Sequence, residues 1–280
     1  MIVLNVKYLG TGAAEGIPAV FCHCKVCNHA RINKGRNIRT RAQALIDGKL
    51  LLDFGPDTYL HSLEYNLELA NIEVCLVTHS HDDHLYLEDL RARRRSRANL
   101  REGTPALKVY GGKGVKDILK PRDDGFVTKD NSVLFCPIRA FEQVEILDGY
   151  IVTAIPALHS SNEPFVYIIQ KDSKTFLYGH DTDYFEEEVW KYFEKNHIYF
   201  DAISLDCTEG IKHIEYPGHM NFERMQNMCR RLVVEGCIDD DTQIIANHIS
   251  HNGLASYDKA NEVGNSLGYC VAYDGMEIEL

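Results

Sequence analysis

No stretch of this 280-residue sequence approaches the roughly 20 consecutive apolar residues that a membrane-spanning helix needs. The apolar start Ile2-Val3-Leu4 is interrupted by Asn5 and Lys7, so it is too short for the apolar segment of a secretory signal peptide. These absences predict a cytoplasmic protein without a membrane anchor. With 45% hydrophobic residues, the chain is long enough to form one large α/β domain over residues 1–280.

Positive charge is scarce as well. Lys and Arg together number 30 against 41 Asp and Glu, which gives a formal net charge of -11. Nonspecific binding of nucleic acid needs a broad basic face, so this balance argues against nucleic acid as a partner. The local exception is a run of six arginines between Arg91 and Arg101. Two interpretations of this run stay open: a solvated helix face, or a phosphate-attracting rim beside a catalytic site.

Cysteine is present in quantity, but its distribution does not resemble a disulfide framework. The nine cysteines are an odd number, scattered through a chain far longer than small disulfide-stapled domains. Three of them, Cys22, Cys24 and Cys27, stand within six residues. In a reducing compartment this spacing favours a tetrahedral zinc site, with free cysteines as the alternative. A fourth ligand is not evident from the spacing, and the nearby candidates are His23 and His29.

Short apolar runs separated by Gly, Pro, Asn and Asp predict many β-strands with helices between them. Helical spacing predicts one helix that starts at Pro56 and continues to Leu67. A second helix is expected after the capping residue Asn221, with an apolar stripe from Phe222 to Val233 facing the core and Gly236 at its end. This mixture favours stacked sheets flanked by helices.

The most informative segment is Thr78-His79-Ser80-His81-Asp82-Asp83-His84, which directly follows an apolar strand. In an extended segment alternate side chains lie on the same side, so His79 and His81 can reach one metal ion. If the chain then enters a helical turn, Asp83 and His84 can reach a second ion beside the first. A lone histidine is usually structural, but three histidines and a carboxylate within six residues predict a metal centre.

Other residues of metal-ligand type follow later apolar strands. His159, Asp181 and His248 each stand shortly after such a strand. The placement alone does not separate Asp181 from its neighbours His180 and Asp183 as the ligand. Because the same position recurs, we expect several strand ends to supply side chains to one site.

These residues together resemble the metallo-β-lactamase superfamily: the motif His79-x-His81-x-Asp83-His84 is followed by His159, Asp181 and His248. The resemblance extends from about Tyr8 to Asn252, and the four-residue signature is highly specific. It implies a four-layer αββα sandwich with two divalent metal ions at one edge. One ion is then held by His79, His81 and His159, another by Asp83, His84 and His248, and Asp181 bridges them.

The segment Leu52-Asp53-Phe54-Gly55 resembles an earlier Asp-x-Gly motif of the same superfamily. The resemblance implies that Asp53 supports the metal-binding histidines without touching the metal, as hydrogen-bonded carboxylates commonly do.

A narrower resemblance joins the Gly10-Thr-Gly-Ala-Ala-Glu-Gly16-Ile-Pro18 loop and the cysteine triplet to the PhnP-like phosphodiesterases. It implies a structural zinc whose fourth ligand is His251, three residues beyond His248. It also implies that His219 meets the substrate phosphate and protonates the leaving oxygen; the alternative is a surface histidine at a helix entry. The glycines miss the spacing of a nucleotide-binding loop, so we interpret them as permitting a tight turn.

The combined hypothesis is a dinuclear metal-dependent hydrolase of small or cyclic phosphodiesters. In it a metal-bridging hydroxide attacks, Asp83 orients it and His219 assists departure of the alcohol. Zinc or manganese suits the two catalytic positions, and zinc the structural one. We also expect a small-molecule substrate. The sequence does not determine the oligomeric state, and the resemblance leaves a homodimer open because proteins of this fold often pair.

Fold alone does not set the substrate, so alternatives stay open. They are a lactone or thioester hydrolase, a tRNA 3′-processing nuclease, an oxidative protein like those of pyrroloquinoline quinone (PQQ) biosynthesis, and a non-catalytic metal-binding protein. The net acidity and the lack of an obvious long Gly/Pro-rich arm weigh against the nuclease.

Overall fold

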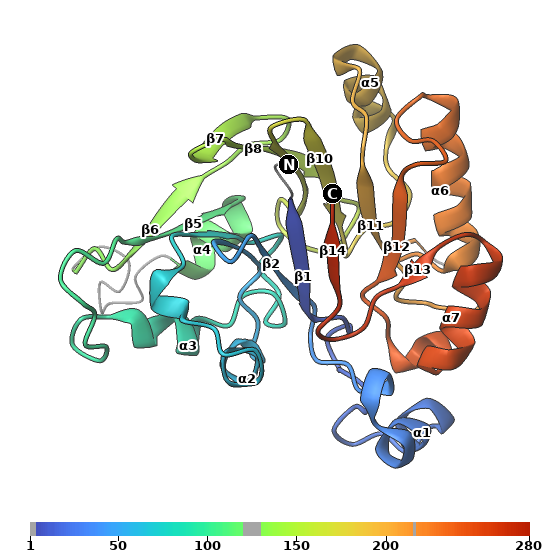
Figure 1. The fold of residues 1–280 in the computed structure, drawn as a ribbon, viewed down its shortest axis with the longest axis horizontal. Helices are drawn as coiled ribbons and strands as arrows, with labels where there is room; N and C mark the ends of the chain where they lie inside the picture. The colour runs from blue at the N-terminus through green and yellow to red at the C-terminus, as the bar shows by residue number, and fades with distance from the viewer. Residues whose placement is uncertain (1–3, 120–129, 215–216) are drawn as a thin grey trace.

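Two seven-stranded sheets form the centre of the computed structural model, which describes residues 4–119, 130–214 and 217–280 (Figure 1). The first sheet has the order β14 (Glu277–Glu279), β1 (Asn5–Gly10), β2 (Gln43–Ile46), β3 (Leu50–Leu52), β4 (Val74–Leu76), β5 (Leu107–Gly111) and β6 (Val133–Pro137). The second has the order β13 (Cys270–Val271), β12 (Gln243–Asn247), β11 (Ala202–Asp206), β10 (Lys174–Gly179), β9 (Phe165–Lys171), β8 (Tyr150–Pro156) and β7 (Gln143–Leu147). Within the described residues, each half of the chain thus builds one sheet, and only the last strand, β14, returns to the first sheet.

Helices cover the outer face of each sheet (Figure 1). On the first sheet lie α2 (Thr58–Glu64), α3 (Leu87–Leu90) and α4 (Lys113–Leu119), with short 3-10 turns at Leu69–Asn71 and Arg91–Arg93. On the second lie α5 (Glu187–Asn196), α6 (Phe222–Val234) and α7 (Tyr257–Ser266). The helix α1 (Lys25–Asn33) projects at one end, with 3-10 turns at Gly35–Asn37 and His251–Gly253. The predicted four-layer αββα sandwich is confirmed.

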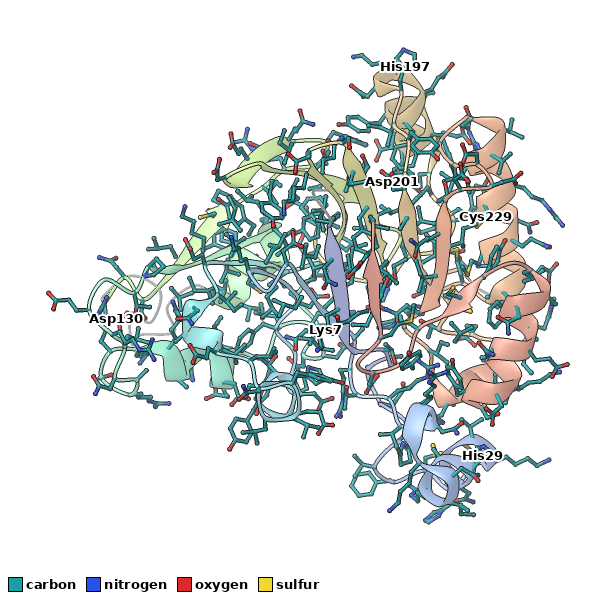
Figure 2. All side chains as sticks on the ribbon, in the orientation of Figure 1. Lys7, His29, Asp130, His197, Asp201 and Cys229 are labelled. Carbon is teal, nitrogen blue, oxygen red and sulfur yellow. The ribbon has the colours of Figure 1, made fainter. Side chains whose placement is uncertain are left out.

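Alternation along the central strands explains the layers. On β10, Phe176 and Tyr178 are fully buried between the two sheets, whereas Leu177 between them packs against the helices of the second sheet. Successive side chains of a strand point to opposite faces, so a strand covered on both sides is apolar throughout. Side chains fill the space between the sheets and the helices (Figure 2). Cys229 on α6, for example, is buried in the core that the second sheet forms with its helices.

The direction of the strands gathers the functional loops at one edge. The strands β3 to β6 run parallel to one another, and so do β10 to β13. The carboxyl ends of parallel strands meet at the same edge of a sheet, where loops from distant parts of the sequence converge. The segments after β3, β4, β8, β10, β11 and β12 therefore lie within reach of one another.

The structure contains both helices expected from the sequence, but the predicted start is accurate for one of them and not for the other. On α6, the Asn221 side chain accepts a hydrogen bond from the backbone N–H of Arg224, and Met225 is buried as predicted. Val233, however, is 55% exposed, because it lies beyond the face that contacts the sheet. The other helix begins at Thr58 and not at Pro56.

The shift at the start of α2 has a local cause. The Thr58 hydroxyl donates to the carbonyl of Gly55, which closes a turn over residues 55–58 before the helix begins. The apolar residues Tyr59, Leu60 and Leu63 of α2 are exposed. Within the described residues, no helix combines the length and the apolar character needed to cross a membrane.

Replacing Phe176 by alanine tests the intersheet core. We expect the free energy of unfolding to fall by about 3 to 5 kcal/mol, because the substitution removes a fully buried ring and leaves a cavity. Tyr59→Ala on the exposed face of α2 is the control, with an expected change within about 0.5 kcal/mol. Denaturant titration measures both, and similar values for the two variants would contradict this account of the core.

Candidate metal centre

The histidine motif follows β4 as an isolated turn. The backbone N–H groups of His84 and Leu85 both donate to the carbonyl of His81, at 3.0 and 2.8 Å, but the next helix begins only at Leu87. The carbonyl of His84 in turn accepts from the N–H of Phe54. The expected helical turn at Asp83 is thus a single turn, which the neighbouring strand-end segment holds in place.

A first cluster consists of His79, His81 and His159. The Nδ1 atom of His81 lies 2.9 Å from Nε2 of His79 and 3.1 Å from Nε2 of His159. The opposite nitrogens are engaged: Nδ1 of His79 faces the Thr78 hydroxyl at 3.0 Å, and Nε2 of His81 faces the carbonyl of Ser160 at 3.2 Å. If those nitrogens carry the protons, the three facing nitrogens present lone pairs to one point, as a metal ion requires.

A second cluster consists of Asp83, His84, Asp181 and His248. The Oδ2 atom of Asp181 lies 2.5 Å from Nε2 of His84 and 3.0 Å from Nε2 of His248, and Oδ2 of Asp83 lies 3.1 Å from the same nitrogen of His84. The other oxygen of Asp181 is 3.9 Å from Nε2 of His159 in the first cluster. The two oxygens of Asp181 therefore face the two clusters.

The alternatives to Asp181 have other partners. Nε2 of His180 lies 2.8 Å from the hydroxyl of Ser204. The carboxylate of Asp183 accepts from the backbone N–H of Gly218 and from the guanidinium of Arg224. The structure thus singles out Asp181 among the three candidates that the sequence left open.

The chemistry of the second cluster suits a cation. Nε2 of His84, Nε2 of His248 and Oδ2 of Asp181 are buried without a hydrogen-bond partner of acceptable geometry. Burial lowers the pKa of His84, but the nearby carboxylates, Asp83 first, outweigh it and hold the pKa well above its usual value. For His79, burial and the neighbouring His84 lower the pKa, which favours a neutral, metal-binding imidazole. Both clusters therefore fit divalent metal ions.

Asp53 lies behind the second cluster and is fully buried. Its Oδ2 accepts from Nδ1 of His84 at 2.7 Å, and its Oδ1 accepts from the backbone N–H and the hydroxyl of Thr78. This arrangement leaves Nε2 of His84 facing the cluster, in keeping with the supporting role expected of Asp53. Gly55 allows the close approach: an added Cβ would lie 2.0 Å from the carbonyl oxygen of Asp83.

Asp206, the last residue of β11, lies at the site although no motif in the sequence predicted it. Its buried carboxylate accepts from the backbone N–H groups of Asp181, Thr208 and Met220 at 2.9 to 3.1 Å. Oδ2 of Asp206 also lies 3.2 Å from Nδ1 of His219. The signal was available, because Asp206 ends an apolar strand just as the candidate ligands do.

The structure places His219 beside both clusters. Its ring centroid is 5.1 Å from that of His159, and its Nδ1 is 3.6 Å from Oδ1 of Asp181. Burial lowers the pKa of His219, but the carboxylate of Asp206 outweighs it and raises the pKa to about 9. A hollow of about 300 Å³ next to the two rings is lined by Leu158, His159, Ser160, Pro217, Gly218 and His219. His219 thus borders a hollow that lies beside the first cluster.

The arginine run stands apart from this hollow. Arg91 pairs with Glu88, and the guanidinium of Arg93 donates to four backbone carbonyls, including those of Ser132 and Pro105. Among the described lining residues of the hollow at His159 and His219, no arginine of the run occurs. Arg93 thus holds loops beside the first sheet together, whereas the ion pair of Arg91 with Glu88 stays within one helical segment.

The glycines of the N-terminal loop permit close backbone contacts. An added Cβ at Gly10 would lie 2.1 Å from the carbonyl oxygen of Arg41, and one at Gly12 would lie 3.0 Å from that of Thr40. Gly16 has a φ of +65°. These constraints agree with a structural explanation of the glycines.

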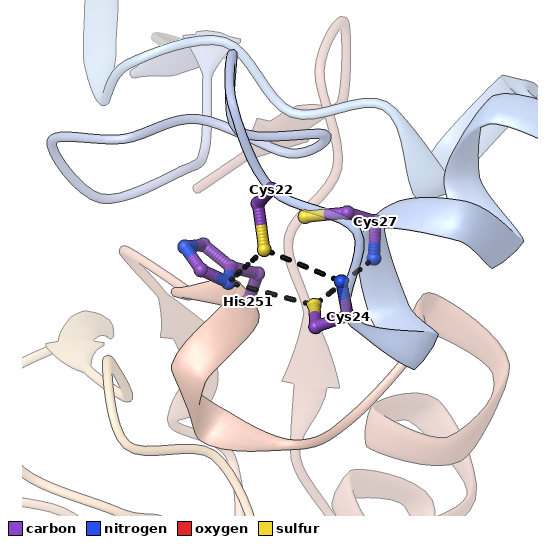
Figure 3. A group of neighbouring side chains, drawn as sticks. All are labelled: Cys22, Cys24, Cys27 and His251. Carbon is purple, nitrogen blue, oxygen red and sulfur yellow. Dashed lines mark hydrogen bonds between the residues drawn. The ribbon is translucent and has the colours of Figure 1, made fainter.

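The cysteine triplet meets His251 from the other end of the chain (Figure 3). Nδ1 of His251 lies 3.5 Å from Sγ of Cys22 and 3.6 Å from Sγ of Cys24. These separations match the distance of about 3.6 Å that a tetrahedral zinc sets between a thiolate and an imidazole nitrogen. The sulfur of Cys27 joins the same group and accepts from the backbone N–H of Ala19. The four side chains fit a zinc ion.

The two local histidines considered as fourth ligand do not join this group. His23 is exposed, and His29 lies on the projecting α1 with Nε2 3.9 Å from a carboxylate oxygen of Asp258 (Figure 2). The structure therefore supports His251 over both of them.

Comparison with known proteins agrees with this geometry. A family model described as a beta-lactamase superfamily domain matches residues 49–238, more than half of the chain. The chain belongs to the metallo-β-lactamase superfamily. This confirms the family resemblance and places the chain among metal-dependent hydrolases.

Solved structures of this superfamily share the whole fold. A diphosphatase from the PhnP family has a TM-score of 0.76 at 22% identity, and the match covers 100% of this chain and 98% of that chain. Zinc-bound PqqB from Methylobacterium extorquens has a TM-score of 0.74 at 20% identity, covering 99% and 100%. At these identities the likeness shows the fold alone.

Curated superfamily members match over shorter stretches. Ribonuclease Z of Bacillus subtilis is 30% identical over 174 residues, which are 60% of this chain and 49% of the relative. Coenzyme PQQ synthesis protein B of Methylobacterium radiotolerans is 29% identical over 167 residues, 55% and 52% of the two chains. The chain thus spans about half the length of the curated relatives it matches, and their functions differ from one another.

Asp53→Asn tests the supporting carboxylate. The amide retains an acceptor oxygen but loses the negative charge opposite His84, so metal affinity should fall about 10- to 100-fold. Titration with a competing chelator measures this change. Asp57→Asn at the start of α2 is the control, because Asp57 pairs with Arg41 outside both clusters. Equal affinity in wild type and Asp53→Asn would contradict the role given to Asp53.

Cys24→Ser tests the cysteine site. We expect metal analysis to show a loss of one zinc per chain relative to wild type, and thermal unfolding at a lower temperature, because a structural zinc contributes directly to folding stability. Cys270→Ser, at an exposed cysteine on β13, is the control and should change neither quantity. An unchanged zinc content in Cys24→Ser would rule out this ligand set.

Proposed function

We propose that this protein is a metal-dependent phosphodiesterase that acts on small or cyclic phosphodiesters. The observation that carries the proposal is the position of His219, whose Nδ1 faces Asp206 while its ring stands beside His159 of the first cluster. A histidine with a raised pKa next to a pair of cation sites is suited to protonating an oxygen that leaves phosphorus. The similarity to a PhnP-family diphosphatase supports hydrolysis at phosphorus.

The proposed ligand sets follow the clusters. His79, His81 and His159 would hold one divalent ion, Asp83, His84 and His248 would hold another, Asp181 would contribute to both, and Cys22, Cys24, Cys27 and His251 would hold a structural zinc. Zinc or manganese suits the first two positions. When bound, two adjacent divalent ions supply a water of lowered pKa and stabilise charge on the attacking and leaving oxygens.

The chain's own residues place the groups around the phosphate. Asp206 holds the imidazole of His219 through Nδ1, which leaves Nε2 to donate its proton to the departing alcohol. Asp83 is the less buried carboxylate of the second cluster, and neighbouring His84 holds its pKa well below the usual value against the effect of burial. Asp83 is thus an ionised acceptor that can orient an attacking water.

A tRNA-processing nuclease is the second candidate, because of the 30% identity to a ribonuclease Z. Such a substrate is a large polyanion, and the formal net charge of -11 opposes its association. The hollow of about 300 Å³ beside His219 also suits a small alcohol group. Both features favour a small phosphodiester.

The test combines a substrate panel with His219→Ala. The wild-type protein, with about three metal ions per chain, should cleave bis(p-nitrophenyl) phosphate and 2′,3′-cyclic nucleotides, and chelation should abolish this activity. His219→Ala should reduce kcat for the cyclic substrate about 10²- to 10⁴-fold with unchanged metal content, because the proton donor is lost.

His213→Ala, an exposed histidine on the same loop, is the matched control and should behave as wild type. Activity confined to phosphomonoesters, lactones or thioesters would overturn the proposed substrate class. An unchanged rate in His219→Ala would remove the role of this residue.

A further inference from the structure

Three parts of the chain that border the candidate metal centre meet at Asp183, two residues after Asp181. Its side chain is 4% exposed. The Oδ2 atom accepts from the backbone N–H of Gly218 at 3.0 Å and from the guanidinium of Arg224 on the first turn of α6. The Oδ1 atom accepts from the N–H of Tyr184 at 2.7 Å. This carboxylate therefore ties the loop after β10 to the loop that carries His219 and to α6.

The same segment is also bonded to the loop that carries His159. The backbone N–H of Leu158 donates to the hydroxyl of Thr182 at 3.0 Å, and the N–H of Asp183 donates to the carbonyl of Leu158 at 3.3 Å. Residues 182–183 thus join the loops of His159 and His219.

These two loops together line the hollow beside the metal clusters. One loop contributes Leu158, His159 and Ser160, and the other contributes Pro217, Gly218 and His219. Leu158 and Pro217 also border a second hollow of about 540 Å³, whose lining includes Asp183 and Arg224. The ion pair therefore stands next to the two loops that line the hollow where the leaving group would lie.

Gly218 is open on the side where a side chain would stand. An added Cβ at this residue would meet no described atom within 4 Å, and its φ of +135° lies in a region open mainly to glycine. The hydrogen bond from the N–H of Gly218 to Asp183 therefore constrains the loop at this point. A buried carboxylate needs its charged partner, so removing Arg224 would leave the charge of Asp183 without its countercharge.

We propose that Asp183 and Arg224 are positioning residues that set the separation of the His159 and His219 loops and hold His219 where it protonates the leaving alcohol. This inference rests on the proposed function, because it assumes that His219 is the proton donor. Neither residue belongs to the metal clusters. A misplacement of about 1 Å can cost up to about 10²-fold in rate, so a loosened loop has a measurable effect.

The readout is the dependence on the leaving group. The p-nitrophenolate ion leaves without protonation, whereas the alkoxide released from a 2′,3′-cyclic nucleotide needs a proton. A residue that acts through His219 should therefore matter for the cyclic substrate and little for bis(p-nitrophenyl) phosphate. A residue that only stabilises the fold should affect both alike.

The experiment compares Arg224→Gln, Arg224→Lys and Asp183→Asn with wild type on both substrates, with metal content measured on each protein. For Arg224→Gln we expect kcat to fall at least about tenfold with the cyclic substrate and less than about threefold with bis(p-nitrophenyl) phosphate. Arg224→Lys keeps the positive charge and should recover most of the loss. In a His219→Ala background, Arg224→Gln should cause no further loss with the cyclic substrate.

Arg231→Gln is the matched control. Arg231 lies on the same helix and also pairs with a carboxylate that follows β10, that of Glu187 at 2.5 Å, but it lines neither hollow. Equal losses on both substrates, or a further loss in the His219→Ala background, would overturn the positioning role. If His219→Ala itself showed no difference between the substrates, the proton donor of the proposed function would fall together with this inference.

Discussion

The buried carboxylate of Asp181 is the constraint on which the centre of this protein depends. It has one oxygen directed at the imidazoles of His84 and His248 and the other toward His159, with the side chain 6% exposed. An ionised carboxylate removed from water needs compensating positive charge, and the surrounding imidazoles supply it only when protonated. Two divalent ions would satisfy the carboxylate and leave the imidazoles neutral. Burial of Asp181 at this edge of the sandwich therefore needs the positive charge that bound cations would supply.

The fold brings these side chains together because each sheet contains a parallel part: β3 to β6 in the first sheet and β10 to β13 in the second. Parallel strands end at one edge, and several of these ends provide side chains to the site: Asp53 after β3, the motif from His79 to His84 after β4, Asp181 after β10, Asp206 on β11 and His248 after β12. Backbone hydrogen bonds of the sheets fix these ends rigidly, so the site needs little ordering of loops before it binds its ligands. Where a loop does contribute, as at His219, a buried carboxylate holds it.

Much of this arrangement was predictable from the sequence, and the reasons are local. The spacing of His79, His81, Asp83 and His84 is read within one short segment, and the cap of α6 at Asn221 depends on adjacent residues. Partnerships across the chain carry no comparable signal. The bonds of Asp206 to Met220 and of Asp183 to Arg224 join segments 14 and 41 residues apart, and only the fold brings them together. The exposure of the apolar residues of α2 could not be predicted either. Apolar residues at helical spacing predict a helix, but they do not show whether another part of the protein covers that face.

The cysteine site connects the centre to the N-terminal part of the chain. His251 stands three residues after His248, so a zinc held by His251 and the cysteine triplet would tie the end of β12 to the loop after β1. Backbone hydrogen bonds join the same two segments. The N–H of Ala13 donates to the carbonyl of Ile249, and the N–H of Ile249 donates to the carbonyl of Thr11. The close approach depends on Gly12, which forms bridges to both Arg41 and Ile249. A metal ion outside the catalytic centre would thus stabilise the segment that carries His248, since a fixed ligand loses less conformational entropy when it coordinates its own ion.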